Sequence, residues 1–184
     1  MIRLTIAAML ASISIPSMAV GASSIEDFAG RWTGEAIEIS DQSISPDLLN
    51  IDVGERDGGF ELSWNDLTQI SQDASSVEPL TASFVSTNRE NVFEYAPEAG
   101  SFLDRMFASP ATGNPLDGET LLWARIDADM LAVYKLTIDN NGGFDLGHYS
   151  WTRTDDGLLM HYREQTEELG NEIVIEGRLV PAGE

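Results

Sequence analysis

The chain has no cysteine. Disulfide bonds are therefore excluded, and so is a lipid anchor of the bacterial lipoprotein type, which is attached to a cysteine at the signal cleavage site. With neither constraint available, a domain built from this sequence has to be stabilised by its hydrophobic core. The chain is long enough to bury one.

Basic residues are scarce. The chain has 10 Lys and Arg against 31 Asp and Glu, a formal net charge of −21, and Lys135 is its single lysine. Such a surface repels phosphate backbones and anionic lipid headgroups, so we expect no nucleic-acid partner. The acidic residues are scattered rather than clustered, which favours a role in solubility over a docking site for a cationic partner.

Catalytic motifs are missing as well. The sequence has no Gly-x-Ser-x-Gly elbow, no His-Glu-x-x-His pair, no glycine-rich phosphate loop and no EF-hand loop. Its two histidines, His148 and His161, leave little nucleophilic machinery. We therefore expect no catalytic residues and no cofactor, and rank an enzyme behind the binding functions.

No hydrophobic run is long enough to cross a bilayer as a helix, which takes about 20 residues. The N-terminal run from Leu4 to Ile15 follows Arg3 and precedes the small residues around Ala19. A charged start, a short apolar stretch and a small-x-small end predict a secretory signal over residues 1–19, with cleavage after Ala22 as the alternative. We then expect a bacterial protein, periplasmic or secreted, whose residues 20–184 form one domain.

Short runs of alternating polarity dominate the rest of the chain. They cover residues 30–39, 48–53, 60–64, 80–86, 91–95, 119–126, 130–138, 144–153, 158–165 and 172–180. Turns rich in Asp, Asn and Gly separate the last five runs. The pattern predicts an all-β, antiparallel, up-and-down meander of about ten strands, with one helical turn at 24–28. It closes into a barrel or, alternatively, folds as a β-sandwich.

The first predicted strand opens with Phe28-Ala29-Gly30-Arg31-Trp32-Thr33-Gly34. A Gly-x-Trp start after a short helical turn resembles the calycin barrels, the family of lipocalins and fatty-acid-binding proteins. The resemblance implies a calycin-like barrel closed at one end by Gly30 and Trp32, with Arg178 packed over the Trp32 ring. It bears on the barrel more than on a ligand, because the Arg-x-Tyr clamp of the fatty-acid-binding proteins is absent.

The two histidines flank the turn Asp155-Asp156-Gly157. A three-residue loop would pair Thr154 with Leu158 and put the histidines on opposite faces of the sheet. A two-residue loop would pair Thr154 with Gly157 and put both on one face, near enough to consider a metal. Asp-Asp-Gly favours the three-residue loop, so we expect no metal site.

One face of the later strands combines apolar residues with a few polar tips. We expect this face to line the barrel interior and to form a ligand site. The expected site residues are Trp123, Arg125, Tyr134, His148 and Tyr162. The commoner alternative is a filled core with the polar tips at its rim, in which Arg125 faces solvent and meets an acid.

Residues 101–107 predict a short helix within the long loop 96–118. Its apolar side consists of Phe102, Leu103, Met106 and Phe107. Two helical turns are not stable alone in water, so this side is expected to cap the core or to form a lid over the barrel mouth.

These features favour an exported β-barrel that binds a small apolar or amphipathic molecule non-covalently. The alternative is an interaction or inhibitor module of the cell envelope with a filled barrel, which docks through its acidic face or the 96–118 loop. The sequence leaves the oligomeric state open.

Overall fold

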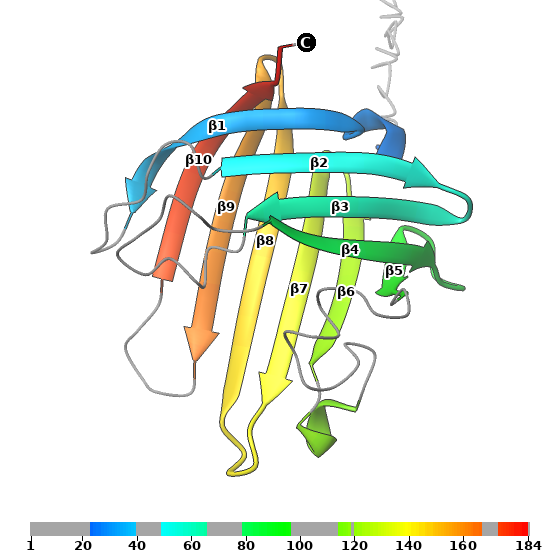
Figure 1. Ribbon diagram of the computed structural model, residues 1–184, viewed down its shortest axis with the longest axis vertical. Helices are drawn as coiled ribbons and strands as arrows, with labels where there is room; N and C mark the ends of the chain where they lie inside the picture. The colour runs from blue at the N-terminus through cyan, green and yellow to red at the C-terminus, as the bar shows by residue number, and fades with distance from the viewer. Residues whose placement is uncertain are drawn as a thin grey trace, which may run out of the picture.

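The computed structural model describes residues 23–39, 49–65, 79–96, 114–118, 120–166 and 173–183. Within them the chain forms ten antiparallel strands that close into a barrel, in the order β1-β10-β9-β8-β7-β6-β5-β4-β3-β2 (Figure 1). The predicted all-β meander is confirmed, and the barrel rather than the sandwich is the form it takes. A closed antiparallel barrel is compatible with the calycin-like fold that the first strand suggests.

The strands begin and end close to the predicted positions. They are β1 (Gly30–Ile39), β2 (Leu49–Arg56), β3 (Gly59–Asn65), β4 (Pro79–Ser86), β5 (Val92–Tyr95), β6 (Leu121–Asp127), β7 (Met130–Ile138), β8 (Phe144–Thr154), β9 (Gly157–Thr166) and β10 (Ile173–Pro181). Every consecutive pair is antiparallel, and β1 also pairs with β10, which leaves no open edge in the sheet.

The barrel is flattened into two layers. Strands β1 to β4 run across the direction of β6 to β10, and the lower ends of β7, β8 and β9 extend past the first layer (Figure 1). The core lies between the layers and is rich in aromatic rings. Phe60 stacks on Phe84 at 5.0 Å between ring centroids, and the Tyr149 ring lies 4.4 Å from that of Tyr162. Such packing stabilises the barrel without disulfides.

One 3-10 turn, η1 (Ile25–Asp27), precedes the first strand, as the sequence predicted. The Asp27 carboxylate accepts a hydrogen bond from the Ser24 backbone N–H at 2.9 Å, which caps the turn. The same carboxylate forms an ion pair with Arg153 at 3.1 Å. Phe28, fully buried, follows the turn and anchors it to the core. A second 3-10 turn, η5 (Pro115–Asp117), precedes β6.

The hairpin between β8 and β9 contradicts the predicted loop. Thr154 pairs with Gly157, so the connection is the two-residue form made by Asp155 and Asp156. Gly157 has a positive φ, +152°, and belongs to β9 rather than to the loop. Its lack of a side chain is required because a Cβ there would overlap the Leu179 carbonyl oxygen on β10. The close approach of β10 therefore explains the glycine.

Two predicted features lie outside the described residues. They are the secretory signal over residues 1–19, with its alternative end at Ala22, and the short helix that carries Phe102, Leu103, Met106 and Phe107. In the part of the chain that the structure describes, no helix is long and apolar enough to span a membrane.

Candidate ligand-binding site

The prediction that one face of the later strands lines the barrel interior is wrong, because most of the expected site residues lie on the outer face. On β6 the buried side chains are Leu122, Ala124 and Ile126, so Trp123 and Arg125 point outward. The register continues across the sheet, where Trp123 pairs with Tyr134 and Tyr134 pairs with His148. These three rings therefore lie together on the outer face rather than in the barrel.

Arg125 and Tyr162 have separate surroundings. Arg125 is exposed and forms an ion pair with Asp127 at 2.9 Å, which is the solvent-facing alternative considered for it. Tyr162 alone of the five points inward, where it is fully buried. Its hydroxyl donates to a Glu164 carboxylate oxygen at 3.1 Å. The five residues therefore do not form one site.

The error has a physical cause. Both faces of β6 and β7 carry apolar residues, so polarity alternation does not distinguish the inner face from the outer one. The predicted face carries the larger aromatic residues, whereas the interior of this sheet takes smaller ones such as Ala124 and Val133 beside the large rings of β8. The inner register is decided by packing against β1 to β4, which the sequence does not display.

The three residues expected to close the barrel do not all come together. Gly30 has a φ of +119°, and Trp32 packs against the core while its Nε1 donates to the Phe28 carbonyl at 3.0 Å. Arg178, however, is exposed and pairs with Glu35 on the outer face, whereas Trp32 pairs with Pro181. Arg178 therefore does not pack over Trp32, because the two side chains point to opposite faces of the sheet.

The two-residue hairpin places both histidines on the outer face. His148 pairs with Arg163 and His161 pairs with Ser150, which makes the histidines diagonal neighbours. His161 Nδ1 lies 3.1 Å from a Glu176 carboxylate oxygen. In the described ranges no group of three or more potential ligands is positioned to hold a metal ion.

Burial lowers the pKa of His148 below its ordinary value of 6.5, and the positive charge of Arg163 and the neighbouring His161 lower it further. The Tyr134 ring stacks on the imidazole with 4.6 Å between ring centroids. His148 is therefore neutral at pH 7. Its Nε2 is buried and has no hydrogen-bond partner in the described part of the chain.

The depressed pKa of His148 makes stability depend on pH. Below pH 6.5 the unfolded chain binds a proton at His148 before the folded chain does, so the free energy of unfolding falls as the pH drops below 6.5. Above 6.5 this contribution is intact. Urea unfolding at pH 7.5 and 5.5 should show a smaller loss for His148→Phe than for the wild type. Equal losses in the two proteins would contradict this assignment.

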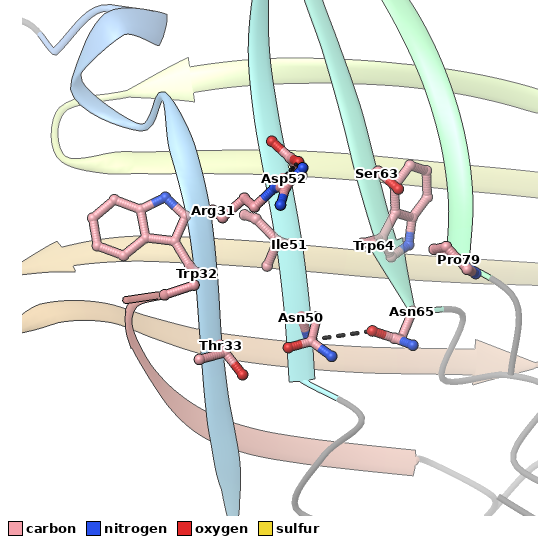
Figure 2. Close-up of a pocket in the computed structure, with 11 residues that line it drawn as sticks. Arg31, Trp32, Thr33, Asn50, Ile51, Asp52, Ser63, Trp64, Asn65 and Pro79 are labelled. Carbon is pink, nitrogen blue, oxygen red and sulfur yellow. Dashed lines mark hydrogen bonds and ion pairs between the residues drawn. The ribbon is translucent and has the colours of Figure 1, made fainter. Parts of the chain in front are cut away.

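A pocket of about 240 Å³ is lined by residues of β1, β2 and β3. Each of these strands contributes three consecutive residues (Figure 2). Pro79 and Ala182 are the other described residues of the lining. The apolar lining residues include Trp32, Ile51 and Trp64, which form one cross-strand row. The volume lies just below the range of drug-sized sites, so the pocket suits a smaller molecule.

The polar lining residues are already organised by contacts with one another. Arg31 Nε lies 2.9 Å from an Asp52 carboxylate oxygen, in an ion pair exposed to solvent. The Asn65 side-chain oxygen accepts a hydrogen bond from the Asn50 backbone N–H at 3.2 Å, which joins β3 to β2 (Figure 2). The Arg31 charge is therefore largely balanced at the rim of the pocket.

Trp64 is the unusual member of the lining. Only 3% of it is exposed, yet its indole Nε1 has no hydrogen-bond partner among the described residues. Its ring contacts Tyr149 edge-on at 5.8 Å, and it lies beside Pro79 at the β4 side of the pocket (Figure 2). A buried donor without a partner costs about 1–3 kcal/mol, but the nitrogen is enclosed, so an acceptor in the pocket would remove this penalty only if the Trp64 ring shifted.

A second indole provides a comparison. Trp151 is fully buried and its Nε1 also has no partner in the described part of the chain, but Trp151 does not line the pocket. Sequence reasoning placed Trp64 in a strand and gave it no role. The alternation Phe60-Leu62-Trp64 indicated an inward tryptophan, whereas the missing hydrogen bond could not be foreseen from the sequence.

No model of a known protein family, no curated protein and no solved structure matches the chain. The assignment of the candidate site therefore depends on the geometry of its residues.

Proposed function

We propose that the barrel is a non-covalent binding protein for a small, uncharged, amphipathic molecule, held in the pocket of β1, β2 and β3. The observation that carries the proposal is the buried indole N–H of Trp64, unpaired in the described residues, at a pocket with apolar and polar walls. After a shift of the Trp64 ring that uncovers this N–H, a ligand with a carbonyl or hydroxyl oxygen would accept from it, and the apolar body of the ligand would contact Trp32 and Ile51.

Charge favours a neutral ligand. The protein carries a formal charge of −21, which repels anions from the surface, and the one arginine of the lining already faces Asp52. Among the described lining residues a cation would find only the Asp52 carboxylate, and Arg31 already pairs with it. An uncharged oxygen acceptor matches the Trp64 N–H, which has no partner among the described residues.

A carbonyl probe and a matched hydrocarbon test the proposal. Acetophenone and ethylbenzene have similar shapes, but only acetophenone has an oxygen that can accept from Trp64. In ligand-observed NMR titrations, Trp64→Phe should weaken acetophenone binding about five- to tenfold, the value of one hydrogen bond, and leave ethylbenzene unchanged. Trp151→Phe removes the other unpaired N–H away from the pocket and should change neither affinity. Equal weakening of both probes by Trp64→Phe, or no binding to the wild type, would overturn the proposal.

We also propose that the barrel acts outside the cytoplasm after loss of residues 1–19 or 1–22. A native mass spectrum of the protein isolated from its own cells reports both the mature N-terminus and any bound small molecule. A mature start at Val20 or Ser23 together with a bound small molecule is the expected result. A chain that keeps Met1 would contradict the export proposal but leave the binding proposal to the probe titrations.

The second candidate is the protein-interaction module. The observation that favours it is the aromatic and apolar outer face of β6, β7 and β8, because an antiparallel sheet normally turns a polar face to solvent. The two functions use different surfaces of the barrel and do not exclude each other.

A further inference from the structure

A row of cross-strand neighbours runs over the outer face of the barrel from β5 to β9. In order along the row, the residues are Glu94, Trp123, Tyr134, His148 and Arg163. The three rings are stacked, with centroids 4.9 Å apart for Trp123 and Tyr134 and 4.6 Å for Tyr134 and His148. The interplanar angles are 9° and 10°. We call this set the outer ladder.

The surface beside the outer ladder is apolar. In the next row Leu121 pairs with Leu136 and Leu136 with Leu146, and beyond them Ile138 pairs with Phe144. All five are half-buried rather than buried. The outer face of β1 to β4 is different, since its rows contain residues such as Arg31, Asp52 and Ser63. Contiguous apolar surface of this kind marks an interaction site on a folded protein.

The charges at the ends of the outer ladder select the occupant. Glu94 is exposed at one end and Arg163 is exposed at the other. Consider two copies packed face to face through this surface and related by a two-fold axis in the contact plane. If the axis runs along the strands and passes Tyr134, Glu94 of each copy lies opposite Arg163 of the other. An axis along the row would instead oppose like charges. A self-complementary surface of this type is what a two-fold dimer requires.

We propose that the outer ladder is the contact surface of a homodimer, with the two Tyr134 rings at its centre and two Glu94–Arg163 pairs at its ends. This dimer contact uses the outer ladder and does not involve the ligand pocket, which lies on β1, β2 and β3. The overall charge of −21 on each copy opposes association, and added salt screens this long-range repulsion. The dimer should therefore be stronger at 0.5 M than at 0.05 M NaCl.

Sedimentation equilibrium of the mature chain at both salt concentrations tests the dimer. Glu94→Arg and Arg163→Glu should each weaken dimerisation about tenfold or more, because each creates two facing pairs of like charge. The double variant Glu94→Arg with Arg163→Glu should restore it. Both side chains are exposed, so at low salt and micromolar chain, where dimer formation is suppressed, the thermal unfolding of the single variants should match the wild type and serve as the control.

A variant at the centre gives a second readout. Tyr134→Glu places two carboxylates at the axis and should abolish the dimer, whereas Thr81→Glu on the outer face of β4 should leave it intact. A wild type that stays monomeric at 0.1 mM chain in 0.5 M NaCl would overturn the proposal. So would a dimer insensitive to Tyr134→Glu, or charge variants that the double exchange fails to rescue. Acetophenone binding to Tyr134→Glu should be unchanged, which separates a failed dimer from a failed ligand site.

Discussion

Replacing Trp151 by alanine should lower the free energy of unfolding by about 3–5 kcal/mol, the range for deleting a large buried aromatic side chain. Trp151 is fully buried on the inner face of β8, and its ring lies 6.0 Å from that of Tyr149. Tyr149 in turn contacts Trp64 and Tyr162, so the vacancy would open beside the central aromatic cluster. Urea unfolding at pH 7.5 measures the loss.

Trp123→Ala is the matched control because it deletes the same side chain from the opposite face. Trp123 is half-buried and stacks on Tyr134, so its loss should cost about 1 kcal/mol, the value of an aromatic pair. Both variants should be measured at low salt and at a micromolar protein concentration, where dimer formation is suppressed. If the two variants lose equal stability, the inward register of β8 and the outward register of β6 are wrong.

Gly157→Ala should destabilise the barrel by about 3 kcal/mol or more, because two penalties act together. The backbone at Gly157 has a φ of +152°, a conformation that strains any residue with a Cβ. The added Cβ would also overlap the Leu179 carbonyl oxygen and come within 3.4 Å of the Val180 Cα. Both are backbone atoms of the neighbouring strand, so relief requires β9 and β10 to separate.

Gly54→Ala is the control for this prediction. Gly54 is an exposed strand glycine on β2, and a Cβ there would meet no atom within 4 Å. Its substitution should change stability by about 0.5 kcal/mol or less, or raise it slightly, since alanine restricts the unfolded chain. A Gly157→Ala protein as stable as Gly54→Ala would show that β9 and β10 do not approach as closely as described.

The sequence by itself determined the strands and their order. Period-two alternation and turns such as Asp139-Asn140-Asn141-Gly142 are local signals, and antiparallel neighbours joined by short loops follow from them. The N-terminal turn before β1 was also determined locally, because Ser24 and Asp27 stand at the spacing that caps a helix start. These features need no knowledge of what lies across the barrel.

The tertiary structure decided which face of each strand points inward and which polar groups remain unpaired. For β6 and β7 both faces are apolar, so only packing between the two layers sends Ala124 inward and Trp123 outward. The hairpin at Asp155-Asp156 has the shorter loop, and its Gly157 lies where β10 passes close to β9. The pocket joins β1, β2 and β3 with Pro79 and Ala182 across the chain, and packing leaves the Trp64 N–H there without a partner among the described residues. Local patterns specify pairing along the chain, whereas contacts between distant segments fix the register and the site.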